Sequence, residues 1–198
     1  MMNDTFNTIS TVSAGLFKEK GSKFLAFAHP IEKMEEVKAI IDDYRKKYHD
    51  ARHVCYAYAL GATGTEMRAN DDGEPSGTAG RPILGQIQSF GLTNVLVVVV
   101  RYFGGVLLGT GGLVVAYKAA AFESLSQANI VEQTIEDTLE IQFEFPFLND
   151  VMKLIKKTNA RIVHQDFNME CNMKLSIRQS EFEGFKIALL KIDRLTIL

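Results

Sequence analysis

The chain has 198 residues, of which 46% are hydrophobic and 23% are charged, so its composition is that of a folded protein and excludes intrinsic disorder as the default. The formal net charge is −2, and the sequence pI is about 6.1, which excludes a strongly basic nucleic-acid binder. Residues 1–130 hold 13 basic and 13 acidic residues, and residues 131–198 hold 9 and 11, so any RNA contact has to depend on a local patch.

The first part of the chain has the pattern of a β-hairpin followed by a helix and a strand. Strand-like segments at 9–17 and 23–29 flank a charged turn at 18–22, which predicts the hairpin. Apolar residues then repeat with helical spacing over 37–48. A short apolar strand is predicted at 54–60.

The middle of the chain combines a long polar segment with the most apolar run. Residues 61–80 lack periodicity and predict a long loop, which in a compact domain is typically functional. Pro82 favours a short helix that ends near Phe90. The run 95–100 predicts a central strand buried on both faces, and it is far shorter than the roughly 20 residues of a membrane span. A helix of small residues is expected over 110–128.

A new pattern of alternation starts near Thr138 and predicts a second domain. Its expected elements begin with a strand near 139–145, a helix near 148–155 and a strand at 160–167. The next strand is the one in which Met169, Cys171, Met173, Leu175 and Ile177 alternate with polar residues. A helix near 182–189 and a strand at 195–198 complete the domain. The order βαββαβ describes a ferredoxin-like fold. The polar stretch 129–137 marks the boundary, so the predicted domains are 1–130 and 131–198, and the fold class is α+β.

The cysteines and the N-terminus indicate where the protein works. Cys55 and Cys171 form neither a CxxC pair nor a metal-ligand spacing, so we expect two buried, reduced thiols and a reducing compartment. Residues 1–10 lack the basic region and apolar core of a signal peptide. We therefore expect a cytoplasmic protein with no membrane association.

Glycine is concentrated in one part of the chain, because twelve of the 15 glycines lie between Gly61 and Gly112. Residues 101–112 lead from the buried strand into a helix, a geometry that presents free N–H groups and the positive helix end to an anion. The residues that would form this loop are Gly104, Gly105, Gly109, Thr110, Gly111 and Gly112. A turn packed tightly under the sheet is the alternative, and the sequence leaves both open.

Two common phosphate-binding motifs fail in this loop. Gly104 and Gly109 have the Walker spacing, but Thr110 stands where the motif requires a lysine. The segment 109–111 starts a dinucleotide fingerprint, but Val114 stands where the third glycine belongs. Neither a nucleotide cofactor nor any other cofactor is therefore predicted.

Carboxylates gather in the second glycine-containing segment, 70–81. Asp71, Asp72 and Glu74 do not have the alternate spacing of a calcium loop, so no metal site is predicted. These carboxylates either cap backbone N–H groups and pair with Arg52, Arg68, Arg81 or Arg101, or contact a partner directly.

Basic and nucleophilic side chains also lie near this segment. Arg52 and His53 precede a strand and are expected to face the 70–81 loop. The basic residues from Arg45 to His53 either contact RNA or form the solvated end of a helix. Ser76 lacks a nucleophile-elbow context, and Cys55 lies in an apolar strand, so no catalytic residue is predicted.

Three ordered blocks of sequence resemble the IMPACT/YigZ family: 50–53 (DARH), 71–80 (DDGEPSGTAG) and 99–114 (VVRYFGGVLLGTGGLV). The resemblance implies an N-terminal domain similar to domain IV of elongation factor G, a βαβ-type, ribosomal-protein-like fold, and a C-terminal domain similar to its domain V. Eukaryotic relatives regulate translation by binding a scaffold of the amino-acid-starvation response, but they lack the C-terminal domain, so that partner does not transfer. For bacterial members the resemblance implies a translation-linked or nucleic-acid-binding role with no catalytic residues to carry over.

Together these observations predict a non-enzymatic protein that contacts the ribosome, RNA or a translation factor. The residues expected on its contact surface are Arg52, His53, Asp71, Asp72, Glu74, Arg101 and the loop Gly104, Gly105, Gly109, Thr110, Gly111 and Gly112. One alternative is a small enzyme or nucleotide-binding protein that holds a phosphate-bearing ligand in the 104–112 loop. Another is a module that binds only protein.

Overall fold

The computed structural model describes residues 4–168 and 170–198, so the expectation for Met169 lies outside the described residues. The chain is a mixed α/β protein of two compact units, each with its own apolar core. The larger unit is Phe6–Gln133, and the smaller one contains Thr134–Leu198 together with Asp4 and Thr5. The inclusion of residues 4 and 5 in the smaller unit was not anticipated from the sequence.

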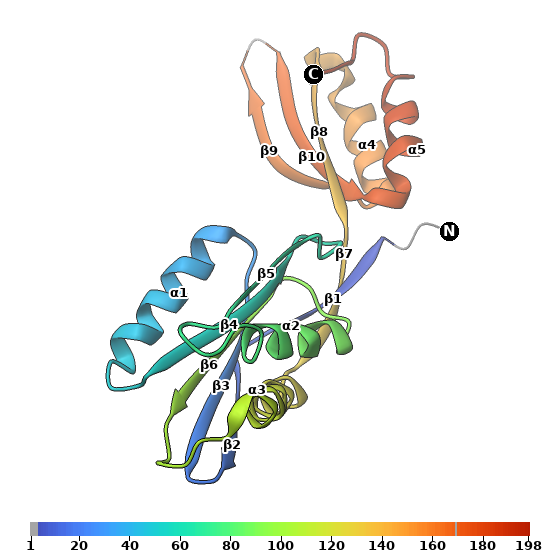
Figure 1. Cartoon of the computed structure of the whole chain (residues 1–198). Helices are drawn as coiled ribbons and strands as arrows, with labels where there is room; N and C mark the ends of the chain where they lie inside the picture. The colour runs from blue at the N-terminus through green and yellow to red at the C-terminus, as the bar shows by residue number, and fades with distance from the viewer. Residues whose placement is uncertain (1–3, 169) are drawn as a thin grey trace. The chain divides into compact units, whose positions relative to one another are not determined.

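The larger unit is built on a five-stranded antiparallel sheet (Figure 1). Its strands, in spatial order, are β2 (Ser13–Glu19), β3 (Ser22–Pro30), β6 (Val95–Tyr102), β4 (His53–Leu60) and β5 (Glu66–Asn70). β6 lies between β3 and β4 and is antiparallel to both, so the connection through α1 (Met34–Lys47) forms a split β-α-β unit. A separate pair joins β1 (Thr5–Ile9) to β7 (Ile130–Thr134).

Helices cover both faces of this sheet. α2 (Gly80–Ser89) and α3 (Gly109–Ser126) cover one face, and α1 lies on the other (Figure 1). The alternation of side chains along β6 serves both layers: Val95, Val97 and Val99 join the core with α2 and α3, whereas Leu96, Val98 and Val100 join the core with α1. The run is continuously apolar because each face of the central strand is buried.

The hairpin between β2 and β3 turns on Lys20 and Gly21, both with positive φ (45° and 78°). This geometry suits a two-residue hairpin turn, and Gly21 adopts it without a steric cost. The predicted hairpin is therefore confirmed, but a single strand over 9–17 is wrong, because residues 10–12 separate β1 from β2.

The prediction of a structureless loop over 61–80 is also wrong, because β5 lies within it. β5 is an edge strand that pairs only with β4, and its first three residues are exposed. An edge strand with little burial needs no apolar alternation, so the pattern that reveals buried strands is missing here. Residues 61–65 form the turn before β5, and residues 71–79 form the loop before α2.

The smaller unit is a four-stranded antiparallel sheet with two helices. Its strands, in spatial order, are β11 (Thr196–Ile197), β8 (Glu136–Phe143), β10 (Cys171–Arg178) and β9 (Arg161–Phe167). A 3-10 turn η1 (Phe145–Phe147) leads into α4 (Leu148–Thr158), and α5 (Gln179–Leu189) follows β10. Val151, Ile155, Phe185 and Leu189 of the helices join one core with the inward residues of the sheet.

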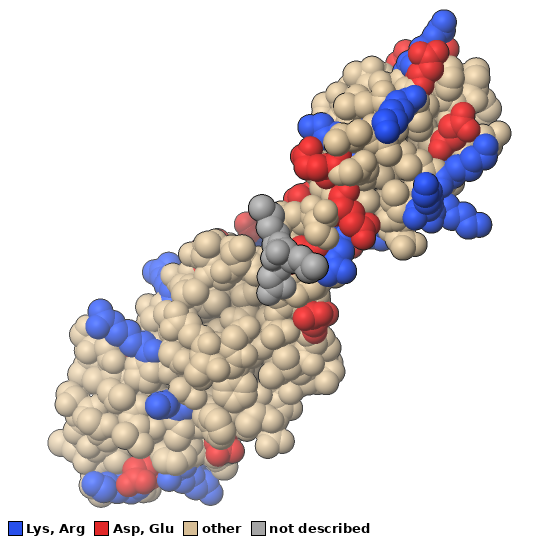
Figure 2. Space-filling view, turned by 90° about the vertical axis from the view of Figure 1, so that its right-hand side faces the viewer, with Lys and Arg blue, Asp and Glu red and all other residues tan. Residues whose placement is uncertain are grey.

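The surface of the larger unit carries few charges on the face seen in Figure 2. Lys, Arg, Asp and Glu are sparse there and stand closer together on the smaller unit. A charged partner that contacts this face of the larger unit therefore has to be recognised by local groups. Among the described residues, no helix is long and apolar enough to cross a membrane.

Candidate ligand-binding site

The three sequence blocks meet at one pocket of about 330 Å³ in the larger unit. The start of β4, the 71–79 loop, the end of β6 and the start of α3 each contribute to its wall. The lining residues are Arg52, His53, Glu74, Pro75, Arg101, Phe103, Leu107, Leu108, Gly109, Thr110 and Leu113. Six residues of the predicted contact surface are among them: Arg52, His53, Glu74, Arg101, Gly109 and Thr110.

A buried ion pair lies at this pocket. Arg101 donates from Nη1 to Oε1 of Glu74 over 2.5 Å, and the hydroxyl of Tyr117 donates to the same oxygen over 2.8 Å. Both charged side chains are more than nine-tenths buried, so the pair is held where water does not screen it. Glu74 is thus fixed by two donors.

The guanidinium of Arg101 also has aromatic neighbours. It lies 5.5 Å from the ring centre of Phe24 and 5.8 Å from that of Phe103, and its Nε has no hydrogen-bond partner among the described residues. The guanidinium of Arg52, on the exposed side, is also 5.8 Å from the Phe103 ring centre. Phe103 therefore lies against two cations, and Arg52 is the one accessible to a ligand.

The imidazole of His53 is oriented by the neighbouring loop. Nδ1 lies 2.8 Å from the carbonyl oxygen of Asp72, and because a carbonyl only accepts, Nδ1 carries a proton. Nε2 lies 3.9 Å from Oε1 of Glu74, which is too long for a hydrogen bond. His53 thus presents Nε2 to the pocket without a close partner there.

Asp71 and Asp72 hold the 71–79 loop in shape and do not line the pocket. Asp71 accepts three backbone N–H groups, from Gly77, Ala79 and Gly80, at 2.8–3.0 Å. Burial alone raises the pKa of this carboxyl, but these N–H donors outweigh burial and hold it below the ordinary value. The capping role that the sequence analysis left open is therefore the one that Asp71 adopts.

Asp72 joins the loop to its surroundings. Its carboxylate accepts the backbone N–H of Val54 at 2.7 Å and a guanidinium N–H of Arg45 at 2.8 Å. The arginine partner is thus Arg45, which was not among the four arginines expected from the sequence. Asp72 has a φ of 44°, an uncommon conformation for a residue other than glycine, which its side-chain bonds help to maintain.

The 104–112 loop contains both a packed turn and an open helix start. The N–H of Gly104 donates to the hydroxyl of Ser22, and a Cβ on Gly104 would lie 1.9 Å from the backbone carbon of Gly21. Gly105 and Gly109 have φ of 88° and 69°, which other residues rarely adopt. α3 begins at Gly109, and the first N–H groups of a helix lack intrahelical acceptors. Gly109 and Arg52 both line the pocket. Gly104 is thus a packing residue, whereas Gly109 and Thr110 face the pocket; Gly105, Gly111 and Gly112 do not line it.

Several pocket residues were missed by the sequence analysis. Phe103 directly precedes Gly104, and Leu107 and Leu108 stand between Gly105 and Gly109; Leu107 is 83% exposed although it is apolar. An apolar run inside a glycine-rich loop was the signal that could have identified them. Tyr117, which holds Glu74, gives no such signal, because it has the helical spacing of the other buried residues of α3 and so resembles an ordinary core residue.

Neither thiol lines the pocket. Cys55 and Cys171 are both buried and free. Burial raises the pKa of each thiol. The Sγ of Cys55 lies 3.3 Å from the hydroxyl oxygen of Tyr117. The structured residues contain no group of three or more His, Cys, Asp or Glu side chains that is placed to hold a metal ion.

The fold and the pocket together define a two-unit α/β protein with a candidate binding site in its larger unit. The family model of the Impact N-terminal domain matches residues 20–125, a range that contains every residue of the pocket. The chain is 32% identical to IMPACT family member YigZ of Escherichia coli over 177 residues, covering 88% of this chain and 87% of that protein. The chain belongs to the IMPACT family, which confirms the resemblance seen in the sequence.

Two further comparisons extend this result. The Protein IMPACT homolog of Saccharomyces cerevisiae is 35% identical over 96 residues, which are 46% of this chain and 36% of that protein. A solved structure described as the crystal structure of a hypothetical protein is 29% identical, with a TM-score of 0.78 over 100% of this chain and 98% of the other. The two-unit fold thus occurs in a related protein at nearly full length.

Proposed function

We propose that this protein acts by binding a component of the translation machinery, such as the ribosome, its RNA or a translation factor, rather than by catalysis. The resemblance to a family whose eukaryotic members regulate translation supports the link to translation. The observation that carries the proposal is the pocket, where three separated sequence blocks place Arg52 and the start of α3 on one accessible surface. Cytoplasmic localisation remains part of the same proposal.

The chemistry of the pocket favours a partner that presents an anionic group, such as a phosphate. Arg52 offers an exposed guanidinium, and the first N–H groups of α3 add hydrogen-bond donors and the positive end of the helix dipole. Pro75, Phe103 and Leu107 provide apolar walls beside these donors. The buried ion pair between Glu74 and Arg101 stabilises the wall of the pocket, and its charged groups are already engaged with each other rather than available to a ligand.

The domain types expected from the sequence belong to this proposal as well. The strand order β11-β8-β10-β9 with α4 and α5 supports a ferredoxin-like domain over 131–198. The split β-α-β unit in the larger sheet supports the likeness of residues 1–130 to domain IV of elongation factor G.

A nucleotide-binding protein or small enzyme is the second candidate, because the pocket lies at a helix start beside Arg52. Against it, Thr110 replaces the lysine of a Walker motif, and Glu74 is already held by two donors. We expect no hydrolysis of ATP or GTP by the purified protein. Activity that survives repurification and is lost in Arg52→Ala would favour the enzyme instead.

Cosedimentation with purified ribosomes across a salt series tests the proposal. Arg52→Ala should weaken binding by about tenfold, since a charged hydrogen bond contributes about 1.5–3 kcal/mol. Because residues 1–130 carry no net charge, the salt dependence should be shallow. Arg68→Ala, which removes an exposed arginine that does not line the pocket, is the matched control.

Circular dichroism of each variant separates loss of binding from loss of fold. If folded Arg52→Ala sediments like the wild type, the pocket is not the contact surface. If neither the wild type nor Arg52→Ala sediments with ribosomes, while both bind a protein partner, the protein is a module that binds only protein, which is the third alternative.

A further inference from the structure

Near the β2–β3 turn, the face of the larger sheet that carries α1 is left open by the described residues. α1 packs over β4 and β6, and its Tyr44 and Tyr48 cover Phe27 of β3 at ring-centre distances of 4.9 and 6.0 Å. Beyond Phe27, towards the β2–β3 turn, the same face forms a hollow of about 590 Å³. We call this surface the hairpin hollow and define it by Leu16, Lys18, Lys23, Leu25, Tyr102 and Phe103.

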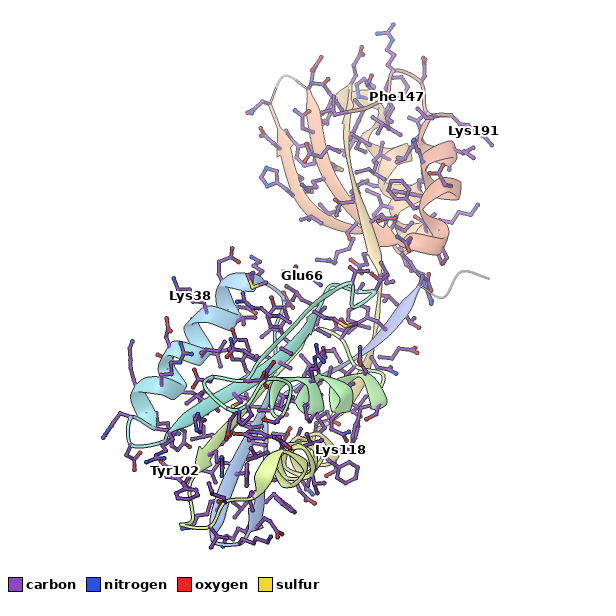
Figure 3. All side chains as sticks on the ribbon, in the orientation of Figure 1. Lys38, Glu66, Tyr102, Lys118, Phe147 and Lys191 are labelled. Carbon is purple, nitrogen blue, oxygen red and sulfur yellow. The ribbon has the colours of Figure 1, made fainter. Side chains whose placement is uncertain are left out.

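The strand register arranges these side chains in two rows. Leu16 lies directly opposite Leu25, and Lys18 lies directly opposite Lys23 in the antiparallel pair of β2 and β3. Tyr102 of β6 lies opposite Lys23 and continues that row, at the end of the sheet where Figure 3 labels it. Leu16 is 48% exposed and Phe103 is 41% exposed, so the hollow has an apolar floor that the described residues leave uncovered.

The two lysines are arranged at a cost to the folded state. Like charges directly opposite each other in an antiparallel pair are destabilising. Among the residues that the structure describes, no acidic side chain forms an ion pair with Lys18 or Lys23. Glu19 alternates to the other side of the sheet, and Asp50 accepts a hydrogen bond from Tyr102 instead. The positive charge of the hollow is therefore not neutralised from within.

We propose that the hairpin hollow binds a segment of a protein partner in which Leu- or Phe-type side chains stand beside Asp or Glu. The apolar side chains would cover Leu16 and Leu25, and the carboxylates would pair with Lys18 and Lys23. Charge complementarity and the open apolar floor both select this chemistry. The surface is distinct from the ligand pocket, although Phe103 borders both.

The aromatic residues of the hollow argue against a nucleic acid as its occupant. Stacking of bases needs free aromatic faces. Phe103 already lies against the guanidinium groups of Arg52 and Arg101, so one of the two aromatic rings of the hollow is occupied by cations. The remaining floor, Leu16 and Leu25, is aliphatic and suits apolar side chains.

Selection of random 12-residue peptides displayed on phage tests this proposal on the full chain. Peptides are selected on the wild type without depletion on any variant. The enriched peptides are then measured on Lys18→Glu/Lys23→Glu, a variant that keeps like charges opposite each other and so should be as stable as the wild type. The enriched peptides should combine Asp or Glu with Leu or Phe. Measured by fluorescence anisotropy, their Kd should rise at least tenfold in the double variant and at least threefold in Leu16→Ser.

Lys38→Glu/Lys46→Glu, which reverses two exposed charges on α1, is the control and should leave the Kd unchanged. Arg52→Ala should also bind these peptides normally, which separates this surface from the ligand pocket. The proposal is overturned if no acidic peptide is enriched, or if the enriched peptides bind the double variant as tightly as the wild type. It is equally overturned if a 12-nucleotide oligouridylate, rather than a peptide, shows the dependence on Lys18 and Lys23.

Discussion

Glu74 and Arg101 meet in the interior of the larger unit, with Oε1 of the carboxylate 2.5 Å from Nη1 of the guanidinium. The two residues come from different sequence blocks, the 71–79 loop and the end of β6, and Tyr117 of α3 donates to the same carboxylate. This contact therefore ties together three segments that surround the ligand pocket.

Breaking this pair should destabilise the larger unit strongly. Glu74→Ala leaves the buried Arg101 without its counter-charge, which typically costs about 3–5 kcal/mol. Glu74→Leu/Arg101→Met removes both charges and should recover part of that loss. Urea unfolding of the full chain gives the comparison, with Asp43→Ala as a control, because its pair with Lys46 is exposed and contributes at most about 1 kcal/mol. A loss below 1 kcal/mol in Glu74→Ala would show that the pair does not hold the pocket together.

Asp71→Asn should destabilise the 71–79 loop in a pH-dependent way. The carboxylate accepts three backbone N–H groups, and losing its charge should cost about 2 kcal/mol at pH 7. Because the pKa of Asp71 is lowered in the folded protein, this contribution is present above the unfolded pKa of about 4 and is lost as the pH falls through the folded pKa. Urea midpoints of wild type and variant should thus differ at pH 7 and approach each other at pH 3. An equal difference at both pH values contradicts the role of the charge.

Two glycines of the 104–112 loop should respond oppositely to alanine. A Cβ at Gly104 would lie 1.9 Å from the carbon of Gly21 and 2.1 Å from the nitrogen of Ser22, so Gly104→Ala has to displace backbone and should cost about 2 kcal/mol or more. A Cβ at Gly111 meets nothing within 4 Å, and alanine favours helix, so Gly111→Ala should match or exceed the wild-type stability. Thermal unfolding followed by circular dichroism decides this, and similar losses in both variants would be incompatible with the packed turn.

The two cysteines should be unreactive in the native protein. Both thiols are buried, and burial raises the pKa of each, so the reactive thiolate is scarce as well as inaccessible. A chromogenic disulfide reagent at pH 8 should react with fewer than one tenth of the thiols in the native state and with both in guanidinium chloride. Ser126→Cys, at an exposed site, is the positive control and should add one fast thiol. Rapid native labelling of Cys55 would require the site to open.

Patterns local in sequence carried much of this architecture. The apolar run of β6 predicted a strand buried on both faces, and the charged turn with Gly21 predicted the β2–β3 hairpin. The helical spacing over 37–48 predicted α1. These features depend on near neighbours along the chain, and the periodicity of burial records them directly. The family, too, was recognisable from three short blocks, and six of the predicted contact residues line one pocket.

Contacts between residues far apart in the sequence leave no periodic pattern, and only the tertiary structure revealed them. The edge strand β5 lacks a buried face, so its sequence resembles a loop. Asp4 pairs with Arg178 across 174 residues and accepts the N–H of Ser180, which places the N-terminal residues 4 and 5 in the smaller unit. The opposition of Lys18 and Lys23 follows from the register of a hairpin, and the meeting of Glu74 with Arg101 follows from the packing of a loop on the end of β6. Composition and spacing identify which residues are polar or flexible, but which of them pair through space is determined only when the chain folds around its hydrophobic cores.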